Sequence, residues 1–211
     1  MTTRGRLITL EGGEGAGKST LASGLVAALA GQGRSVVQTR EPGGSPLAEA
    51  LRGLVLQSWD EGMTPQTEAL IMSAARAAHW RAKIAPALAA GQWVICDRFI
   101  DSTAAYQGSA GVTPAQLTAL AELAVDGHRP DLTLLVDLDP EVGLSRARQR
   151  GDGNRFEAAE MARHQRIRTA FLAAAAAEPQ RFRVLDGMLS AEALLAAAIA
   201  AVVDAQQGGS A

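Results

Sequence analysis

The sequence predicts a single α/β domain over residues 1–211, with a parallel sheet of about five strands and helices on both faces. Short apolar runs alternate along the chain with longer segments rich in alanine and leucine, an order typical of parallel strands joined by helices. The apolar runs are continuous rather than alternating with polar residues, which indicates strands buried on both faces. Ligands of such folds bind beyond the carboxyl ends of the strands, so we expect the functional site there.

The predicted strands are five apolar runs, at residues 7–10, 35–38, 93–96, 132–138 and 182–185. The segment 41–44, Glu-Pro-Gly-Gly, follows the second run and predicts a turn, because proline fixes the backbone and glycine frees it. The last residues, 206–211, are small and polar, and we expect them to be disordered.

The helices are indicated by their start signals. Thr64 before Pro65 has the pattern of a helix N-terminus, and this helix is expected to continue to about Ala90 with a disturbance at Pro86. Thr113 begins another helix with the spacing of a capping box. Further helices are expected over residues 16–30, after residues 139–141, and over residues 191–205.

The composition is that of a globular protein with a formal net charge of −2 and a pI near 5.9. A general nucleic-acid-binding protein usually has a basic excess, so this balance disfavours that class. The one cysteine, Cys96, cannot form an internal disulfide and fits a reducing compartment. No apolar run has the length of a signal peptide or of a membrane span of about 20 residues. We therefore expect a cytoplasmic protein that binds neither nucleic acid nor membrane.

The segment from Gly12 to Ser19 matches the P-loop pattern Gly-x-x-x-x-Gly-Lys-Ser and lies between a predicted strand and a predicted helix. Its glycines let backbone N–H groups converge on phosphate oxygens, and the helix N-terminus adds positive charge. Lys18 is expected to reach the terminal phosphates and Ser19 to offer a hydroxyl to Mg²⁺. The alternative is a tight turn with a chance lysine. Glu14 repels phosphate, so it either accepts a hydrogen bond from a sugar hydroxyl or faces solvent.

Charged residues follow two other predicted strands. Asp97 and Arg98 come after the third, where the carboxylate would serve Mg²⁺ through water and the guanidinium would bind a phosphate with two hydrogen bonds. The alternative is an internal ion pair at the sheet edge. Arg40 ends the second predicted strand and is a similar candidate for binding a phosphate, but its position indicates this role less strongly. Arg52 and Arg76 lie in otherwise apolar helical stretches, where charges are unusual unless they face a cleft.

An arginine cluster, Arg146, Arg148, Arg150 and Arg155, surrounds a Gly-Asp-Gly segment. Arg146 and Arg150 share one helix face, where like charges repel by a few tenths of a kcal/mol, and a visiting polyanion would offset that repulsion. The glycines would let the segment move. Residues 145–157 therefore predict a lid that closes over a phosphoryl group in transfer. The alternative is a solvated, arginine-rich helix end.

From about Leu7 to Leu185, the chain resembles bacterial thymidylate kinases. The matching segments are LEGGEGAGKS (10–19), TREPGG (39–44), AAR (74–76), DRFIDSTAAYQG (97–108), RPDLTL (129–134) and PEVG (140–143). A P-loop alone occurs in proteins of many functions, whereas this ordered set of segments is specific to that family.

The resemblance implies transfer of the γ-phosphoryl group of ATP to dTMP, giving dTDP, with Mg²⁺, as a step in dTTP synthesis for DNA replication. It also implies a homodimer held by helices that pack against each other. The implied ATP site is Gly12, Gly13, Glu14, Gly15, Ala16, Gly17, Lys18, Ser19, Thr20 and Arg146. The implied dTMP site is Glu14, Arg40, Pro42, Arg52, Met72, Arg76, Arg98, Thr103, Tyr106 and Gln107. The implied catalytic residues are Lys18, Glu14, Arg98, Arg148, Arg150 and Arg155, and the implied metal site is Ser19 and Asp97.

The resemblance also implies individual roles at the acceptor site. Glu14 would meet the sugar 3′-hydroxyl, and Tyr106 would lie under the deoxyribose and crowd out a 2′-hydroxyl. The loop lacks an arginine while the lid is rich in them, which is similar to the bacterial subclass whose catalytic cation comes from the lid. The dTMP phosphate would be held by Arg52 and Arg98, and the base would be read by Arg76, Thr103 and Gln107.

The chain departs from the family pattern at Met72, where many relatives have a phenylalanine stacked on thymine. Ser73 lies beside it. A thioether packs against a ring face but lacks π-stacking. We expect this departure to change how tightly the base is bound more than which base is selected, since Arg76 and Thr103 remain.

Two other classes of function stay open at this point. One is a deoxynucleoside kinase or another nucleoside monophosphate kinase on the same fold, although arginines that clamp phosphate favour a monophosphate acceptor. The other is a P-loop switch, but the Asn-Lys-x-Asp run usual in guanine readers is missing from the sequence. Three histidines have no metal-binding spacing and are expected to be structural or surface residues: His79, His128 and His164.

Overall fold

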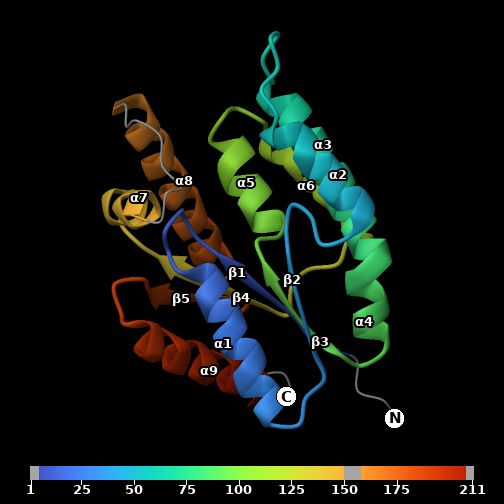
Figure 1. Ribbon diagram of the computed structural model, residues 1–211, viewed down its shortest axis with the longest axis vertical. Helices are drawn as coiled ribbons and strands as arrows, with labels where there is room; N and C mark the ends of the chain where they lie inside the picture. Colours follow the sequence, from blue (N-terminus) through green and yellow to red (C-terminus); the bar gives the residue numbers. More distant parts are fainter. Residues whose placement is uncertain (1–4, 150–157, 208–211) are drawn as a thin grey trace.

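The computed structural model describes residues 5–149 and 158–207, and it contains the predicted parallel sheet (Figure 1). Within these residues the sheet has five strands in the order β2-β3-β1-β4-β5, and every neighbouring pair is parallel. The strands are β1 (Leu7–Glu11), β2 (Val36–Arg40), β3 (Trp93–Asp97), β4 (Leu132–Asp137) and β5 (Phe182–Asp186). This confirms the α/β class, because strands separated by helices pair in parallel.

The helices connect the strands and cover both faces of the sheet (Figure 1). They are α1 (Lys18–Gly31), α2 (Pro46–Leu56), α3 (Pro65–His79), the π-helix η1 (Trp80–Ile84), α4 (Ala85–Ala89), α5 (Ile100–Gly108), α6 (Pro114–Val125), α7 (Pro140–Gln149), α8 (Ala158–Ala177) and α9 (Ala191–Gln207). The caps predicted at Thr64 and Thr113 are both present, the second as a complete capping box.

Three apolar clusters hold the helices to the sheet. On one face, Leu25 of α1 and Leu194 of α9 pack with Ile8 and Leu134. The other face has two clusters: η1, α4 and α6 with β1 and β3, and α8 with β4 and β5. Because both faces are covered, the central strands are almost fully buried, and polar side chains gather at the carboxyl edge.

One helix boundary differs from the prediction for a backbone reason, whereas the disturbance predicted near Pro86 is present. Helix α1 begins at Lys18 rather than at residue 16, because Gly17 has a φ of 88° and the loop therefore continues to that point. The long helix does reach Ala89, but it widens into η1 just before Pro86. Proline has no N–H to donate and its ring crowds the preceding turn, which accounts for the wider coil there.

Two helices were not assigned from the sequence. Helix α5 begins at Ile100 without a side-chain cap at Phe99, and several of its buried residues are polar, so its apolar pattern is weak. Helix α8 mixes charged residues with alanine along most of its length, so its apolar pattern is weak as well. Helix α9 extends to Gln207, so residues 206 and 207 are helical rather than part of a disordered tail. Of the predicted lid, residues 145–149 belong to α7, whereas Arg150 and Arg155 lie outside the described residues.

None of the described helices combines the length and the apolar character that crossing a membrane would require.

Candidate active site

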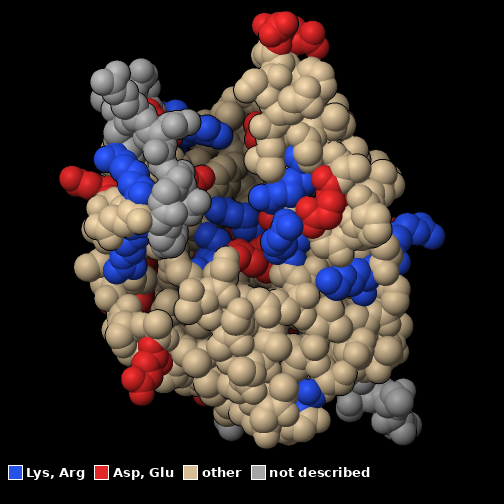
Figure 2. Space-filling model, in the orientation of Figure 1, with Lys and Arg blue, Asp and Glu red and all other residues tan. Residues whose placement is uncertain are grey.

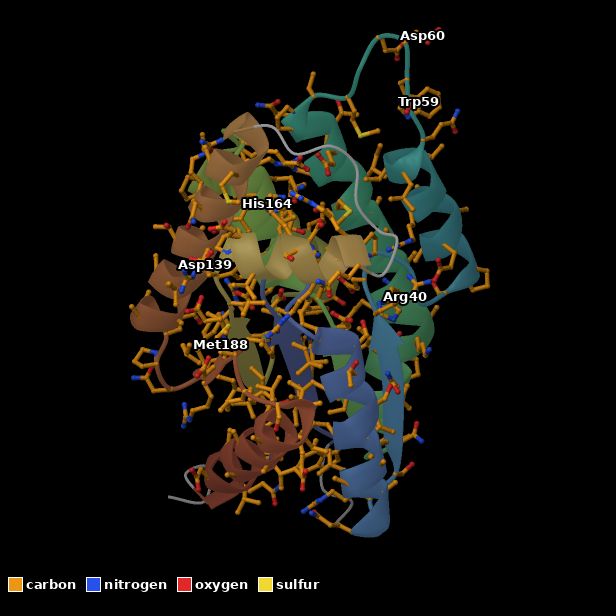
Figure 3. All side chains as sticks on the ribbon, turned by 60° about the vertical axis from the view of Figure 1, so that its left-hand side comes forward. Arg40, Trp59, Asp60, Asp139, His164 and Met188 are labelled. Atoms are coloured by element: carbon orange, nitrogen blue, oxygen red, sulfur yellow. The ribbon has the colours of Figure 1, made fainter. Side chains whose placement is uncertain are left out.

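The polar residues converge at the carboxyl edge of the sheet, where β1, β3 and β4 end side by side. Figure 2 shows basic side chains gathered around a hollow in this part of the molecule, with acidic side chains among them. Figure 3 shows Arg40 on the α2 side of this region, and Asp139 and His164 on the α7 and α8 side. The site therefore lies where the topology of an α/β sheet leaves room for a ligand.

The glycine loop leaves β1 and enters α1. Gly15 has a φ of 70°, and a Cβ atom there would collide with the Gly143 carbonyl at the start of α7, so this close approach requires glycine. Lys18 is buried and donates to the carbonyl oxygens of Gly13 at 2.7 Å and Gly12 at 3.0 Å. Burial, and then the charge of Arg98, lower the pKa of Lys18 to about 7. Phosphate oxygens near the loop would favour the charged ammonium again.

The predicted metal residues lie in direct contact. The Ser19 hydroxyl donates to Asp97 Oδ2 at 2.7 Å, and Asp97 Oδ1 is buried with no hydrogen-bond partner in residues 5–149 and 158–207. Mg²⁺ prefers hard oxygen ligands and keeps several of its waters. A hydroxyl and a carboxylate with an unsatisfied oxygen at the end of a P-loop therefore fit Mg²⁺.

Arg98 is held in a conformation unusual for a residue with a side chain, with a φ of 69°. Its guanidinium donates to Gly12 O at 3.3 Å and to Ser102 Oγ at 3.2 Å, and it lies 4.9 Å from the centre of the Tyr106 ring. These contacts aim the charge at the glycine loop. The backbone strain of a left-handed residue is tolerated where surrounding contacts fix it.

Glu11, which was not singled out from the sequence, holds Phe99 and Ser102 beside this arginine. Its fully buried carboxylate accepts from the Phe99 backbone N–H at 2.7 Å and from Ser102 Oγ at 2.5 Å. Burial and the nearby charge of Asp101 raise the pKa of Glu11 to about 7. A glutamate that ends an otherwise apolar strand was the available signal, because such a charge is rarely buried without a task.

The turn after β2 brings two more predicted arginines together. Arg40 and Arg52 both donate to the carbonyl oxygen of Pro42, at 3.1 and 3.0 Å, and Arg40 also forms an ion pair with Glu49 at 3.1 Å. Arg52 and Arg98 line one cavity of about 640 Å³ with the glycine loop. The same cavity is lined by Lys18, Asp97 and the exposed Glu14.

The residues predicted to read a base form a second group beside this cavity. Arg76 is buried and donates to Thr103 Oγ1 at 2.9 Å, to Phe99 O at 3.0 Å and to Glu41 at 2.7 Å. Gln107 is buried on the same helix as Thr103, and its Oε1 has no partner among the residues described.

The structure shows the surroundings of Met72, the position at which the chain departs from the family pattern. Met72 is half-buried on α3, one helical turn before Arg76. Ser73 beside it lines a cavity of about 310 Å³ together with Arg76 and Thr103. The spare volume that a small residue at position 73 suggested is therefore present, although Met72 does not itself line this cavity.

Of the lid arginines, two belong to the described helix α7. Arg146 donates to Gly187 O at 2.9 Å, in the loop between β5 and α9, and lines a smaller cavity of about 130 Å³ with Gly17 and Thr20. Arg148 is exposed on the same helix. Arg168 of α8, not singled out from the sequence, binds Asp137 with two hydrogen bonds, at 2.7 and 2.9 Å, and so fixes α8 to the end of β4.

The glycine loop joins a strand to a helix. Around one cavity beside it lie a buried lysine, a hydroxyl–carboxylate pair and several arginines. This arrangement defines a P-loop phosphotransferase site. The family model for thymidylate kinase matches residues 10–198, and this chain belongs to the thymidylate kinase family. It is 52% identical over 183 residues to the thymidylate kinase of Pseudomonas fluorescens, covering 86% of this chain and 87% of that one. The thymidylate kinase of Alcanivorax borkumensis is 50% identical, covering 86% and 88%, and that of Caulobacter vibrioides is 49% identical, covering 92% and 94%.

Proposed function

We propose that this protein transfers the γ-phosphoryl group of ATP to dTMP, giving dTDP for the synthesis of dTTP and the replication of DNA. The observation that supports this most is the single cavity in which Lys18 and the glycine loop face Arg52 and Arg98. A phosphate donor and a phosphorylated acceptor can meet there with cations on both sides. Positioning and charge stabilisation account for most of the catalysis in such transfers.

In this proposal the donor half of the site acts mainly through the backbone and one lysine. The glycine loop binds the phosphates of ATP, and Lys18 stabilises charge that develops on the transferred group. Ser19 and Asp97 would hold Mg²⁺, which would neutralise negative charge on the phosphates during the transfer. Arg146, beside the small cavity at the start of α1, would contact the rest of ATP.

The acceptor half would bind dTMP by its three parts. Arg52 and Arg98, with Arg40 behind them on the Pro42 carbonyl, would hold the phosphate. Glu14, exposed at the cavity wall, would accept a hydrogen bond from the 3′-hydroxyl, and Tyr106 would lie under the deoxyribose. The base would meet Met72, Arg76, Thr103 and Gln107.

Arginines of α7 and of the segment after it would complete the site when ATP is bound. Arg148, Arg150 and Arg155 are the candidates, because the glycine loop carries no arginine of its own. A cation from the lid would stabilise the transition state and exclude water at the same time.

We further propose a cytoplasmic homodimer. Helices α2, α3 and α6 lie side by side (Figure 1), and each exposes leucine, with exposed fractions of 62% for Leu47, 57% for Leu70 and 81% for Leu123. Exposed apolar residues on adjacent helices are typical of a protein–protein interface. Light scattering after size-exclusion chromatography is expected to give twice the mass of the 21.9 kDa chain, and Leu123→Glu is expected to shift the protein toward monomer.

Product analysis tests the proposed activity. The protein is incubated with ATP, Mg²⁺ and, in turn, dTMP, thymidine and a panel of other nucleosides and monophosphates, and the products are separated by chromatography. We expect dTDP from dTMP as the dominant product. A preference for thymidine would indicate a nucleoside kinase instead, and slow ATP hydrolysis with no phosphorylated acceptor would indicate a switch.

A further inference from the structure

His79, at the end of α3, is fully buried beside the acceptor half of the site and has no role in the proposal above. Its Nδ1 lies 3.0 Å from Glu41 Oε1, and its Nε2 lies 2.7 Å from Thr39 Oγ1. A carboxylate only accepts, so Nδ1 donates to Glu41, and a neutral ring then accepts from Thr39 through Nε2. Both ring nitrogens are therefore used within the protein.

Glu41 links His79 to Arg76. Its second oxygen, Oε2, accepts from Arg76 Nε at 2.7 Å, while Arg76 also contacts Phe99 and Thr103. Arg76 and Glu41 are both nearly inaccessible to solvent, with exposed fractions of 2% and 4%. In such buried surroundings, the orientation of the guanidinium depends on the positions of its hydrogen-bond partners.

His79 also supports the turn that holds Arg52. The ring lies against Gly44, so closely that a Cβ atom at position 44 would collide with it. Gly44 and Glu41 flank Pro42, whose carbonyl binds Arg52 at 3.0 Å. One side chain thus contacts the group that orients Arg76 and the turn that orients Arg52.

Glu41, His79 and Cys96 have ligand atoms within 4.8 Å of one another, but their chemistry does not fit a buried metal site. Each of them already has a hydrogen-bond partner, including Cys96 Sγ, which donates to Arg98 O at 3.1 Å. Burial raises the pKa of the Cys96 thiol well above its usual range, which disfavours the thiolate that a metal needs. The cluster is a hydrogen-bonded network.

We infer that His79 is a positioning residue for the acceptor nucleotide: through Glu41 it orients Arg76, and through Gly44 and Thr39 it supports the turn that orients Arg52. It sets the spacing between the cation expected at the base and the cation expected at the phosphate. This rests on the proposed function. It predicts that His79 matters for dTMP affinity and leaves ATP affinity unchanged, because within the described residues no hydrogen bond joins the glycine loop to His79, Glu41 or Arg76.

Two substitutions separate positioning from packing. His79→Phe keeps an aromatic ring but removes both hydrogen bonds. His79→Asn removes the ring but places an amide N–H where Nδ1 stands, so it retains the contact with Glu41. The same changes at His128, an exposed histidine whose ring centre lies 4.8 Å from that of Trp80, serve as controls. Calorimetry gives the Kd for dTMP, initial rates give the KM for ATP, and thermal unfolding gives the stability.

We expect His79→Phe to weaken dTMP binding about tenfold, the cost of one charge-assisted hydrogen bond, while the KM for ATP stays within about twofold. His79→Asn should bind dTMP within about threefold of wild type even if its melting temperature falls further. Equal dTMP affinity in wild type and His79→Phe would overturn the inference. Losses of dTMP affinity that simply follow the loss of stability in both variants would overturn it as well.

A second pair of variants covers the case in which one of these proteins does not fold. Glu41→Gln removes the ionic contact to Arg76 and is expected to weaken dTMP binding about tenfold, whereas Thr39→Val leaves that contact intact and is expected to weaken it by less than about threefold. Equal effects would contradict the inference. The wild-type titration separates the two proposals: a wild type that binds no dTMP refutes the proposed function itself.

Discussion

The glycine loop and the acceptor side of the cavity present positive charge by different physical means. The loop uses backbone groups, glycines at positive φ and one lysine, all within ten residues of sequence. The acceptor side uses side chains from β2, α2, α3 and α5, joined by Glu41 and His79. A backbone site tolerates most changes around it, whereas a side-chain network depends on each member.

The two sides also differ in the partners of their buried cations. Lys18 is held by neutral carbonyls, so burial lowers its pKa to about 7. Arg76 is at least as buried but has the carboxylate of Glu41 as its partner. Lys18 on the donor side therefore gains an anionic partner only when a phosphate binds, whereas Arg76 on the acceptor side has one before the nucleotide arrives.

The largest effect is expected on the donor side. Lys18→Ala should lower kcat by about a hundredfold or more, since a group that stabilises developing charge contributes on the order of 3 kcal/mol. Stability should change little, because the protein then no longer buries this ammonium. Steady-state kinetics with thermal unfolding checks both, with Lys83→Ala as the control lysine outside the loop. Normal turnover in Lys18→Ala would refute the P-loop assignment.

The next effect is expected in the arginine cluster. Arg148→Ala should lower kcat about tenfold or more and leave the Kd for dTMP nearly unchanged, because an interaction made only in the transition state has that signature. Arg150→Ala and Arg155→Ala extend the test to the residues outside the described part of the structure, and Arg166→Ala on α8 is the control. If all three cluster variants turn over like wild type, these arginines are solvated surface.

A smaller effect should appear in the pH dependence of stability. The pKa of Glu11 rises from 4.5 to about 7 on folding, so between these values the folded state keeps a proton that the unfolded state has released. Stability from this group is therefore fully present below pH 4.5 and is lost as the pH rises through 7. Glu11→Gln should flatten that slope in thermal unfolding, and Glu122→Gln, at an exposed position of α6, is the control. An unchanged slope would mean that Glu11 titrates normally.

The smallest effect is expected at Met72. Met72→Phe should tighten dTMP binding by about 0.5–1.5 kcal/mol, because a ring can stack on thymine and the cavity beside Ser73 leaves room. Overpacking would oppose this by about 1–3 kcal/mol if the pocket has closed around the thioether. Calorimetry decides, with Met188→Phe, exposed in the loop after β5 (Figure 3), as control. Unchanged affinity would place residue 72 away from the base.

The glycine loop and the acceptor side also differ in how well the sequence predicted them. The loop and its lysine were predictable because a backbone site leaves a local sequence pattern. Asp97 was expected near Ser19, 78 residues away, only because a charged residue that follows a buried parallel strand lies at the edge of the sheet where ligands bind. Glu41 and His79 were not, since their contacts span 35 to 38 residues and nothing in the local pattern at either position shows the partner. Helix α5 was missed because its buried side is polar.

The central claim is that the cavity facing the glycine loop receives an acceptor that already carries a phosphate. Calorimetric titration of dTMP and thymidine into the wild type and into Arg98→Met tests it most directly. We expect the wild type to bind dTMP at least about tenfold more tightly than thymidine, and Arg98→Met to lose most of that difference with thymidine affinity unchanged. Equal affinities for dTMP and thymidine in the wild type, or an equal loss of both in Arg98→Met, would contradict the account.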